Sequence, residues 1–339
     1  MKYRGMVLLA IMLMMAALPA QSQIIKKGQV GFRFLENPIS AEAVGRGALG
    51  VATARTANAA FWNPAGLAWI DGRWDVALNY TKGIADINHT SAAAAVALPR
   101  VGTICVNAIM MDYGEFYGTR RADNEHGFID TGVFSPSAWC LGIAFAQRVS
   151  DRFSYGVHLK YAYQDLGDAW VATAGSDVND PNLVIAQKSY AHGEPAVDVG
   201  AVYDFAYHGI RFGAVIQNVS REIRYERDKF PLPFAVSFAL SVNPLSFLLV
   251  DLQEHDLQIG FESRHPRDFK EKLKVGAEYT LHETLTVRLG YMGNYDERGL
   301  TAGIGLRQSW GGSTMRIDYA FQDFGLFNSV HLFTFGISH

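Results

Sequence analysis

Hydrophobic and polar residues alternate with a period of two along most of the chain, from Trp74 to the C-terminus. In residues 153–163, phenylalanine, tyrosine, valine and leucine occupy every odd position, and serine, glycine, histidine, lysine and alanine stand between them. Such alternation predicts β-strands with two different faces. Fourteen segments show it, near 74–82, 89–98, 101–112, 137–148, 153–164, 195–206, 209–218, 233–243, 255–264, 271–281, 284–293, 299–308, 313–322 and 329–338.

The second face of these strands distinguishes a soluble β-sandwich from a membrane barrel. It carries glycine, alanine and serine with isolated charges of both signs, where a water-exposed sheet would carry lysine, glutamate and threonine throughout. Aromatic residues gather toward the segment ends, as in the girdles of transmembrane barrels, and the segments are long enough to cross a bilayer when tilted. Because lipid offers no hydrogen bonds, such a sheet must close on itself. The sequence therefore predicts an all-β fold, a closed antiparallel outer-membrane β-barrel of about 14 strands over residues 74–339.

The connections between the predicted strands alternate in length. Tight turns at 99–100, 150–151, 207–208, 282–283 and 311–312 alternate with long excursions at 113–136, 165–194 and 218–232 and with shorter ones at 265–270, 294–298 and 323–328. Short periplasmic turns and longer outer loops are typical of bacterial barrels, and an even number of strands leaves both termini in the periplasm. The stretch 244–254 is longer than this pattern predicts.

Residues 1–20 are organised like a secretory signal peptide. Lys2 and Arg4 precede the apolar stretch 6–18, and the small residue Ala20 follows it. The stretch is shorter than the roughly 20 apolar residues of a transmembrane anchor, which is the alternative interpretation. We expect cleavage after Ala20 and export to the bacterial outer membrane.

Composition and motifs exclude several functional classes. The net charge is −3 and 49% of the residues are hydrophobic, which excludes a disordered chain and a basic nucleic-acid-binding protein. Two cysteines are too few for a disulfide framework. The sequence contains no nucleophile–histidine set or paired-carboxylate site, and isolated histidines such as His158 and His331 lack the spacing of metal ligands. We therefore expect no enzyme, no metal and no cofactor.

Residues 21–73 do not alternate and are rich in small side chains. The string 45–50 (GRGALG) matches the glycine pattern of dinucleotide-binding loops, but the strand and βαβ unit that such a loop requires are missing from the predicted elements. Small residues instead allow a backbone to pack closely inside a narrow space. Because about fourteen strands enclose more volume than their own side chains fill, we expect this segment to be an N-terminal plug in the lumen.

Two strings in this segment, 45–50 and 59–68 (AAFWNPAGLA), resemble the N-terminal signature of the PorV/PorQ family, which is related to FadL-type outer-membrane transporters. Weaker matches follow in order along the barrel, at 217–218, 230–233, 275–279, 287–291, 303–306 and 317–320. The resemblance implies a fourteen-stranded barrel whose plug carries an Asn-Pro-Ala motif, here Asn63, Pro64 and Ala65, followed by Gly66. The chain departs from the family at 55–58 (RTAN), where paired acidic residues often occur, and at its C-terminal His339, where an aromatic residue is typical.

Charged residues on the predicted inner face form a candidate lumen lining, either as a selectivity surface or as a scaffold of ion pairs that satisfies buried charge. The candidates are Lys160, Arg211, Glu262, Lys274, Glu278, Arg288, Arg307, Arg316 and Asp318, together with Asp198 and Asp204. Cys105 and Cys140 lie on adjacent predicted strands and face inward, and the sequence leaves open whether they form a disulfide. Asp177, Asn179 and Asp180 are too few for a calcium loop pattern.

The resemblance implies two competing functions. Barrels of this family are associated with the type IX secretion system, where they engage exported cargo or the translocon, and the loops 113–136 and 165–194 would make these contacts. FadL relatives instead transport long-chain fatty acids or other hydrophobic small molecules, with the plug moving to admit them. The loops are polar and lack a long apolar stretch that would capture a lipid, which favours the secretion role. Expected partners are outer-membrane lipid, secretion-system proteins or cargo and, in the alternative, a hydrophobic small molecule; nucleic acid is not expected.

Overall fold

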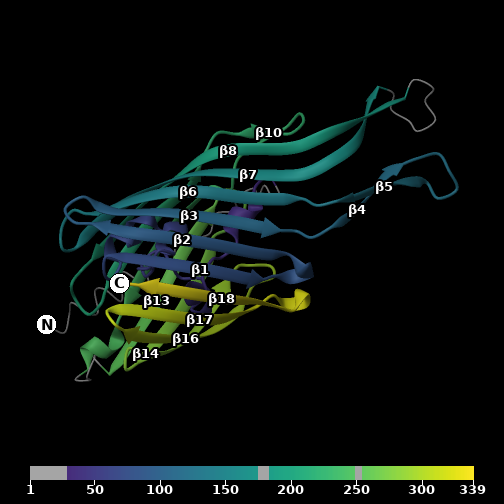
Figure 1. The fold of residues 1–339 in the computed structure, drawn as a ribbon. Coiled ribbons are helices and arrows are strands. Elements are labelled where there is room, and N and C mark those ends of the chain that lie inside the picture. The colour runs from purple at the N-terminus through teal and green to yellow at the C-terminus, as the bar shows by residue number, and fades with distance from the viewer. Residues whose placement is uncertain (1–28, 175–182, 249–253) are drawn as a thin grey trace.

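The computed structural model describes residues 29–174, 183–248 and 254–339. Within these ranges, fourteen antiparallel strands form one closed barrel (Figure 1), which confirms the predicted fold class. The strands are β1 (Trp74–Lys82), β2 (Asn88–Leu98), β3 (Gly102–Asp112), β6 (Ser137–Arg148), β7 (Phe153–Ala174), β8 (Val184–Asp204), β9 (Arg211–Val219), β12 (Ala235–Val242), β13 (His255–Pro266), β14 (Lys272–Leu281), β15 (Leu285–Gly293), β16 (Leu300–Trp310), β17 (Ser313–Asp323) and β18 (Ser329–Ser338).

The first and last strands close the barrel. β1 pairs with β18 over eight residues, from Asp75 opposite Ser338 to Lys82 opposite His331. The other neighbours in the barrel follow one another along the chain, apart from the hairpins inserted after β3 and β9. Closure leaves the described strands of the barrel without an unpaired edge, as a sheet in hydrocarbon requires.

The two faces of the strands follow the alternation in the sequence. Large apolar side chains project from the outer face and are highly exposed, for example Leu289 at 63% and Ile143 at 59%. Their neighbours along the strands, such as Arg288 and Ala144, are buried on the inner face. An outer surface of this kind is stable only in contact with lipid, because in water a continuous band of apolar side chains would be exposed to solvent.

The long excursions contain strands that the barrel pattern does not include. β4 (Phe116–Arg121) and β5 (Phe128–Phe134) form a separate hairpin, and a short one joins β10 (Ile223–Arg224) to β11 (Lys229–Phe230). β7 and β8 run far beyond the predicted boundaries 164 and 195 and form a long ribbon. Figure 1 shows the β4–β5 hairpin and the β7–β8 ribbon at one end of the barrel, with the C-terminus at the other. We call these the hairpin end and the short-turn end.

The connection after β12, for which the sequence offered no explanation, begins with a helical turn. This turn, η4 (Pro244–Phe247), is capped by Asn243, whose side chain accepts a hydrogen bond from the backbone N–H of Leu245 at 3.0 Å. Asn243 also donates to Asp256 of β13 at 2.5 Å. Two further turns, η3 (Ile84–Asp86) and η5 (Gly325–Phe327), lie in connections at the hairpin end. Residues 249–253 lie outside the described ranges, as does the predicted signal peptide.

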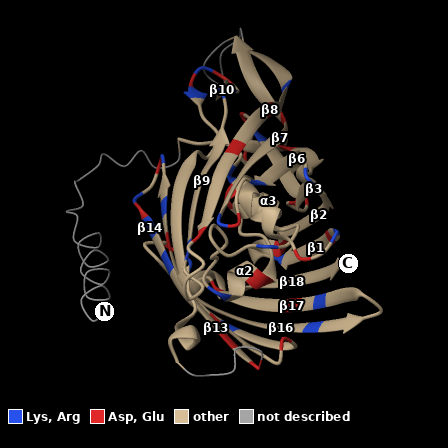
Figure 2. Cartoon of the chain, turned by 90° about the vertical axis from the view of Figure 1, so that its left-hand side faces the viewer, with Lys and Arg blue, Asp and Glu red and all other residues tan. Residues whose placement is uncertain are grey.

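Residues 29–73, which we call the luminal segment, lie inside the barrel. They form η1 (Arg33–Glu36), α2 (Ala41–Gly45), α3 (Ala59–Trp62) and η2 (Pro64–Trp69). Figure 2 shows α2 and α3 within the ring of strands. In the described part of the chain, no helix has the length and apolar character needed to cross a membrane.

Inward-facing glycines of the wall admit the luminal segment at close range. Gly276 and Gly290 lie opposite each other on β14 and β15. A Cβ atom at Gly276 would collide with the carbonyl oxygen of Arg46, and one at Gly290 with the backbone nitrogen of Gly47. Any larger residue would force the backbones apart. The glycines on the inner face of these strands are therefore required for close packing.

The two cysteines are free. Cys140 lies opposite Ile109 on β3, and Cys105 lies opposite Ala144 on β6, so the two are offset by four positions along adjacent strands. This offset corresponds to about 13 Å along the strands, whereas a disulfide needs Cα atoms within about 7 Å. The possibility of a bond that the sequence left open is therefore excluded by register.

This register makes a simple prediction. Denaturation of the purified protein without reductant is expected to expose two reactive thiols per chain, because both side chains are free and become accessible on unfolding. Thiol titration, with and without prior reduction, measures the number. Fewer thiols in the unreduced sample than in the reduced one would contradict this register of β3 against β6.

Candidate functional site

The candidate site is the contact between the luminal segment and the inner wall of the barrel. Its two helices are only four or five residues long, so they depend on side-chain caps and on packing against the wall. Ser40 caps α2 by accepting a hydrogen bond from the N–H of Ala43 at 3.4 Å. The hydroxyl of Thr334 on β18 accepts from the N–H of Ala41 at 2.8 Å. Hydrogen bonds to Ser40 of the luminal segment and to Thr334 of the barrel wall therefore fix the start of α2.

The Asn-Pro-Ala motif joins three parts of the molecule. Asn63 caps η2 through its Oδ1, which accepts from the N–H of Ala65 at 3.1 Å, while Pro64 begins the helical turn. Its Nδ2 donates to the carbonyl of Val51 at 2.8 Å and to that of Ala201 on β8 at 3.1 Å. One buried amide therefore ties the turn to an earlier part of the luminal segment and to the wall.

Ala65 and Gly66, the other two predicted motif residues, are fully buried. A Cβ atom at Gly66 would collide with the carbonyl oxygen of Ala54. The indole nitrogen of Trp62, just before the motif, donates to the carbonyl of Ile39 at 3.0 Å. The motif region is thus a packed junction, and each of its residues has a structural reason for its size or polarity.

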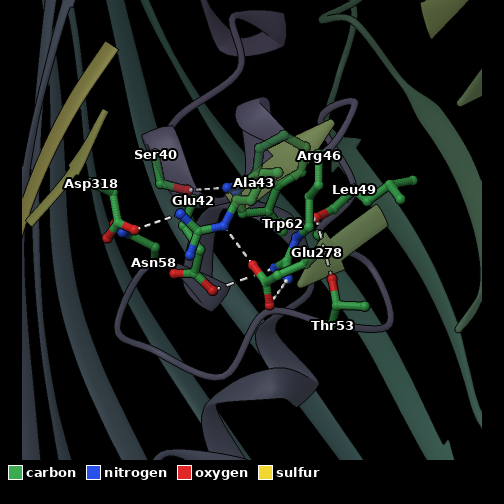
Figure 3. Close-up of polar contacts among 12 residues, drawn as sticks. Ser40, Glu42, Ala43, Arg46, Leu49, Thr53, Asn58, Trp62, Glu278 and Asp318 are labelled. Carbon is green, nitrogen blue, oxygen red and sulfur yellow. Dashed lines mark hydrogen bonds and ion pairs between the residues drawn. The ribbon is translucent and has the colours of Figure 1, made fainter. Parts of the chain in front are cut away.

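An ion-pair network joins α2 to the wall on the short-turn side. The guanidinium of Arg46 lies 3.4 Å from Glu42 and 3.1 Å from Glu278 of β14. Arg288 of β15 pairs with the same Glu278 at 2.5 Å and with Asp318 of β17 at 2.6 Å. Figure 3 shows the contacts of Arg46 with Glu42 and Glu278, with Asp318 on the opposite side of the network. Three strands and one helix are therefore linked through buried and partly buried charges.

A second carboxylate holds the backbone that follows α2. Glu262 of β13 accepts from the N–H groups of Gly50 and Val51, both at 3.3 Å. Its other oxygen pairs with Lys274 at 2.7 Å, and Lys274 also donates to the carbonyl of Ala48 at 3.0 Å. Buried charges are stable only when they are paired and hydrogen-bonded in this way.

The structure places the remaining candidate residues on the inner face as well. Lys160 pairs with Asp198 at 2.7 Å, Arg211 pairs with Asp204 at 2.7 Å, and Arg316 pairs with Asp75 at 2.5 Å. Arg307 lies opposite Arg316 and lines a cavity. All nine candidate side chains therefore face the lumen, and eight of them form ion pairs with other described residues.

Sequence reasoning missed several paired charges of the lumen, among them Glu42, Arg46 and Asp75. Arg46 was noticed only as part of a glycine-rich string, although it is the one charged residue among the small residues at 45–50. Asp75 lies on the inward face of β1, where it also accepts from the N–H of Ala57 at 2.8 Å. Its position in the alternation could have identified it.

Several cavities lie along the lumen between the described residues, and three of them bear on the luminal segment. One of about 430 Å³ opens at the short-turn end and has charged walls that include Glu283 and Arg307. A small one of about 60 Å³ lies beside Trp62, and a third of about 280 Å³ lies at the hairpin end. The first two share no lining residue, because the backbone from Arg46 to Val51 lies between them. In the described structure, the luminal segment therefore divides the lumen.

The described residues contain no group of three or more metal-binding side chains close enough to hold an ion. His158 instead belongs to the charged cluster on the wall, where its Nδ1 lies 3.1 Å from Asp198. The loop residues Asp177, Asn179 and Asp180 lie outside the described ranges.

A closed antiparallel barrel with an apolar outer face and a filled, polar lumen defines an integral outer-membrane β-barrel. The model of the family described as "Type IX secretion system protein PorV" matches residues 20–240, and the chain belongs to this family. The resemblance identified from residues 45–68 is thereby confirmed. A search of curated protein sequences finds no match.

Solved structures with the same fold include several transporters. A Pseudomonas aeruginosa FadL homologue is 13% identical, with 89% of this chain and 98% of that chain covered and a TM-score of 0.57. The Ralstonia pickettii toluene transporter TbuX is 12% identical, with 91% and 98% covered and a TM-score of 0.58. The Pseudomonas putida toluene transporter TodX is 11% identical, with 88% and 96% covered and a TM-score of 0.55. At these identities the likeness establishes the fold alone.

Proposed function

We propose that this protein is a component of the type IX secretion system that engages exported proteins or the translocon at its hairpin end. Family membership is the main support, since the matching family is defined by a secretion protein. The structure supplies a surface suited to this role, in the hairpins that project beyond the barrel (Figure 1).

The β4–β5 hairpin exposes apolar side chains that the barrel does not need. Tyr117 and Val133 lie directly opposite each other and are 87% and 54% exposed. On the other face, Phe116 and Phe134 stack with their ring centroids 5.8 Å apart. Exposed apolar pairs on a hairpin that projects from the barrel are typical of protein contact sites.

The β7–β8 ribbon is braced where it leaves the barrel. Glu226, between β10 and β11, accepts hydrogen bonds from Lys188 and Tyr190 of β8, both at 2.5 Å. These hydrogen bonds lower the pKa of Glu226 below its ordinary value, because they stabilise its ionised form. Beyond this point Trp170 is 45% exposed on the ribbon. A braced ribbon with an exposed aromatic residue can present a contact surface at lower entropic cost than a flexible loop.

As part of the proposal, residues 21–73 act as a plug that closes the lumen. The bonds of Asn63 to the wall and the ion pairs of Arg46 support this role, because they hold the segment across the barrel. A closed lumen is consistent with a protein that works through contacts at its outer surface. Passage of a hydrophobic small molecule, the alternative, would require these contacts to break.

The role of the hairpin can be tested by shortening it. Replacing residues 116–134 with a four-residue Gly-Ser turn is expected to reduce secretion of type IX cargo at least tenfold, because the exposed contact pair is lost. The measurement compares cargo in the medium with cargo retained in the periplasm, in cells producing equal amounts of folded barrel.

A double variant provides the control for folding. Tyr117→Ser with Val133→Ser keeps the hairpin and removes only its apolar surface. This double variant is also expected to reduce secretion. A matched change on the lipid-facing wall, Val106→Ser, should leave secretion unchanged. Normal secretion by the shortened protein would contradict the proposal.

A further inference from the structure

At the hairpin end, the wall of the barrel divides into two arms. The pairing of β6 with β7 ends where Ser137 lies opposite Asp165. Past this pair, β5 pairs only with β4, and β7 pairs only with β8, among the described residues. Figure 1 shows the β4–β5 hairpin and the β7–β8 ribbon diverging from here. Because β5 leads into β6 along the chain, the sides of β5 and β7 that face each other are strand edges without a partner strand.

A bulge and a proline separate the two arms. The register advances by three residues on β7, from Asp165 to Asp168, while it advances by two on β8. The extra residue makes a bulge, which bends a strand. Within it the N–H of Gly167, at a φ of 86°, donates to Oδ1 of Asp165 at 2.8 Å. Between β5 and β6, Pro136 has no N–H with which to continue the pairing to β7.

The two arms touch at their base. A Cβ atom at Gly167 would lie 2.7 Å from the ring of Phe134, so this ring packs directly on the backbone of β7. Phe134 also stacks on Phe116 of the same hairpin, with ring centroids 5.8 Å apart. The two open edges therefore hold their positions before a partner arrives, which lowers the entropic cost of binding.

The two edges of the ribbon differ in how they are protected. On β8, Lys188 and Tyr190 are held by Glu226, and Pro195 follows near the barrel. Lysine, proline and a covering segment are common ways of blocking a strand edge. The stretch Leu166–Ala174, which we call the free edge of β7, contains no lysine, arginine or proline. Its one charged side chain, Asp168, accepts a hydrogen bond from Gln187 at 3.0 Å.

The register shows which backbone groups of the free edge are available. The N–H of Asp204 on β8 donates to the carbonyl of Arg152 at 2.7 Å, and backbone groups alternate in direction along a strand. Counting from this hydrogen bond, with one extra residue at the bulge, directs the backbone of Ala169 and Val171 toward β8. The N–H and C=O groups that point away from β8 are those of Asp168, Trp170 and Ala172.

We infer that the free edge of β7 receives an extended segment of an exported protein as an added antiparallel strand. Backbone hydrogen bonds to the three outward residues would supply affinity, and apolar side chains at alternate positions of the segment would contact Trp170, which is 45% exposed. This mode of binding rests on the proposed function, because it takes the partner to be an exported protein. It adds the part of the partner that is recognised.

Strand addition suits an exported protein better than a second copy of this chain. Backbone groups are common to all polypeptides, so one open edge can accept segments of different sequence. Two copies in one membrane would both have β7 running outward from the barrel, so their edges could pair only in parallel. Parallel pairing is slightly less stable per residue than antiparallel pairing.

Hydrogen exchange on the purified full-length protein in lipid nanodiscs tests the inference. The probe is a type IX cargo protein purified from the periplasm. Excess cargo is expected to slow exchange at Asp168, Trp170 and Ala172 at least tenfold, because their N–H groups gain carbonyl partners. Exchange at Ala169 and Val171, whose N–H groups point to β8, should change much less.

The possible outcomes separate the inference from the proposed function. Cargo that binds without this alternating protection would overturn the inference and leave the secretion role standing. If no cargo binds, both are contradicted. Protection that appears without cargo and grows with protein concentration would assign the free edge to a second copy, which also overturns the inference.

A proline variant provides an independent test. Ala172→Pro removes one outward N–H, and proline is tolerated on an edge strand where the N–H faces solvent. The dissociation constant for the cargo is expected to rise about fivefold to tenfold, as the loss of one hydrogen bond predicts. Ala172→Ser keeps the N–H, is the matched control and should bind as the wild type does. Equal binding by the two variants would contradict strand addition, and exchange in the wild type decides the matter if the proline variant fails to fold.

Discussion

Replacement of Gly290 by leucine is expected to open the barrel to ions. The new side chain would occupy the space now filled by the backbone of Arg46 and Gly47, and overpacking at such a contact costs about 1–3 kcal/mol or more. Moving this backbone joins the cavity at the short-turn end with the one beside Trp62, because it is the wall between them. Planar-bilayer recordings should show discrete openings for the variant and near-background current for the wild type.

The same strand offers a matched control. Gly293 also lies on β15, but a Cβ atom there would meet only ordinary contacts at 3.5 Å and beyond. Gly293→Leu should therefore leave the current at background. Both variants must first show the heat-dependent shift in gel mobility of a folded barrel. A folded Gly290→Leu protein that remains closed would argue against a plug held at this point of the wall.

The barrel could be predicted from the sequence because each strand carries its own signal. Alternation is a local pattern, so the faces of the strand on which Leu289 and Arg288 lie follow from their positions in the sequence alone. Closure then follows from the chemistry of lipid, which permits no free edge. Strand ends are less well determined. β7 and β8 continue from the membrane into water because the hydrogen bonds between them do not depend on which solvent surrounds the strands.

Details of the lumen could not be predicted in the same way. Asn63 bonds to Ala201, which is 138 residues away, and no local pattern indicates that contact. The pairing of Arg46 with Glu278 likewise depends on how the luminal segment crosses the barrel. The family resemblance identified the motif residues, but their physical role required the structure. Alternation placed the inward charges on the correct face without revealing their partners.

Replacement of Glu278 by glutamine is expected to lower the free energy of unfolding by about 2–3 kcal/mol. Its carboxylate pairs with two guanidinium groups, of Arg46 at 3.1 Å and of Arg288 at 2.5 Å. Glutamine has nearly the same shape but no charge, so both cations lose their shared partner. The loss of unfolding free energy is expected to be smaller than for an ion pair excluded from water, because Glu278 lines the cavity at the short-turn end. Urea titration of the protein in detergent micelles, followed by tryptophan fluorescence, measures the change.

A double-variant cycle separates the ion pair from the loss of a side chain. If Arg46 and Glu278 stabilise each other, Arg46→Met should cost much less in the Glu278→Gln background than in the wild type, because the excess positive charge is then already present. Glu271→Gln, in the exposed connection just before β14, is the matched control and should change the free energy by less than about 0.5 kcal/mol. Additive effects of the two network variants would mean that the luminal segment is held by backbone packing at the wall glycines, with no energetic coupling through these charges.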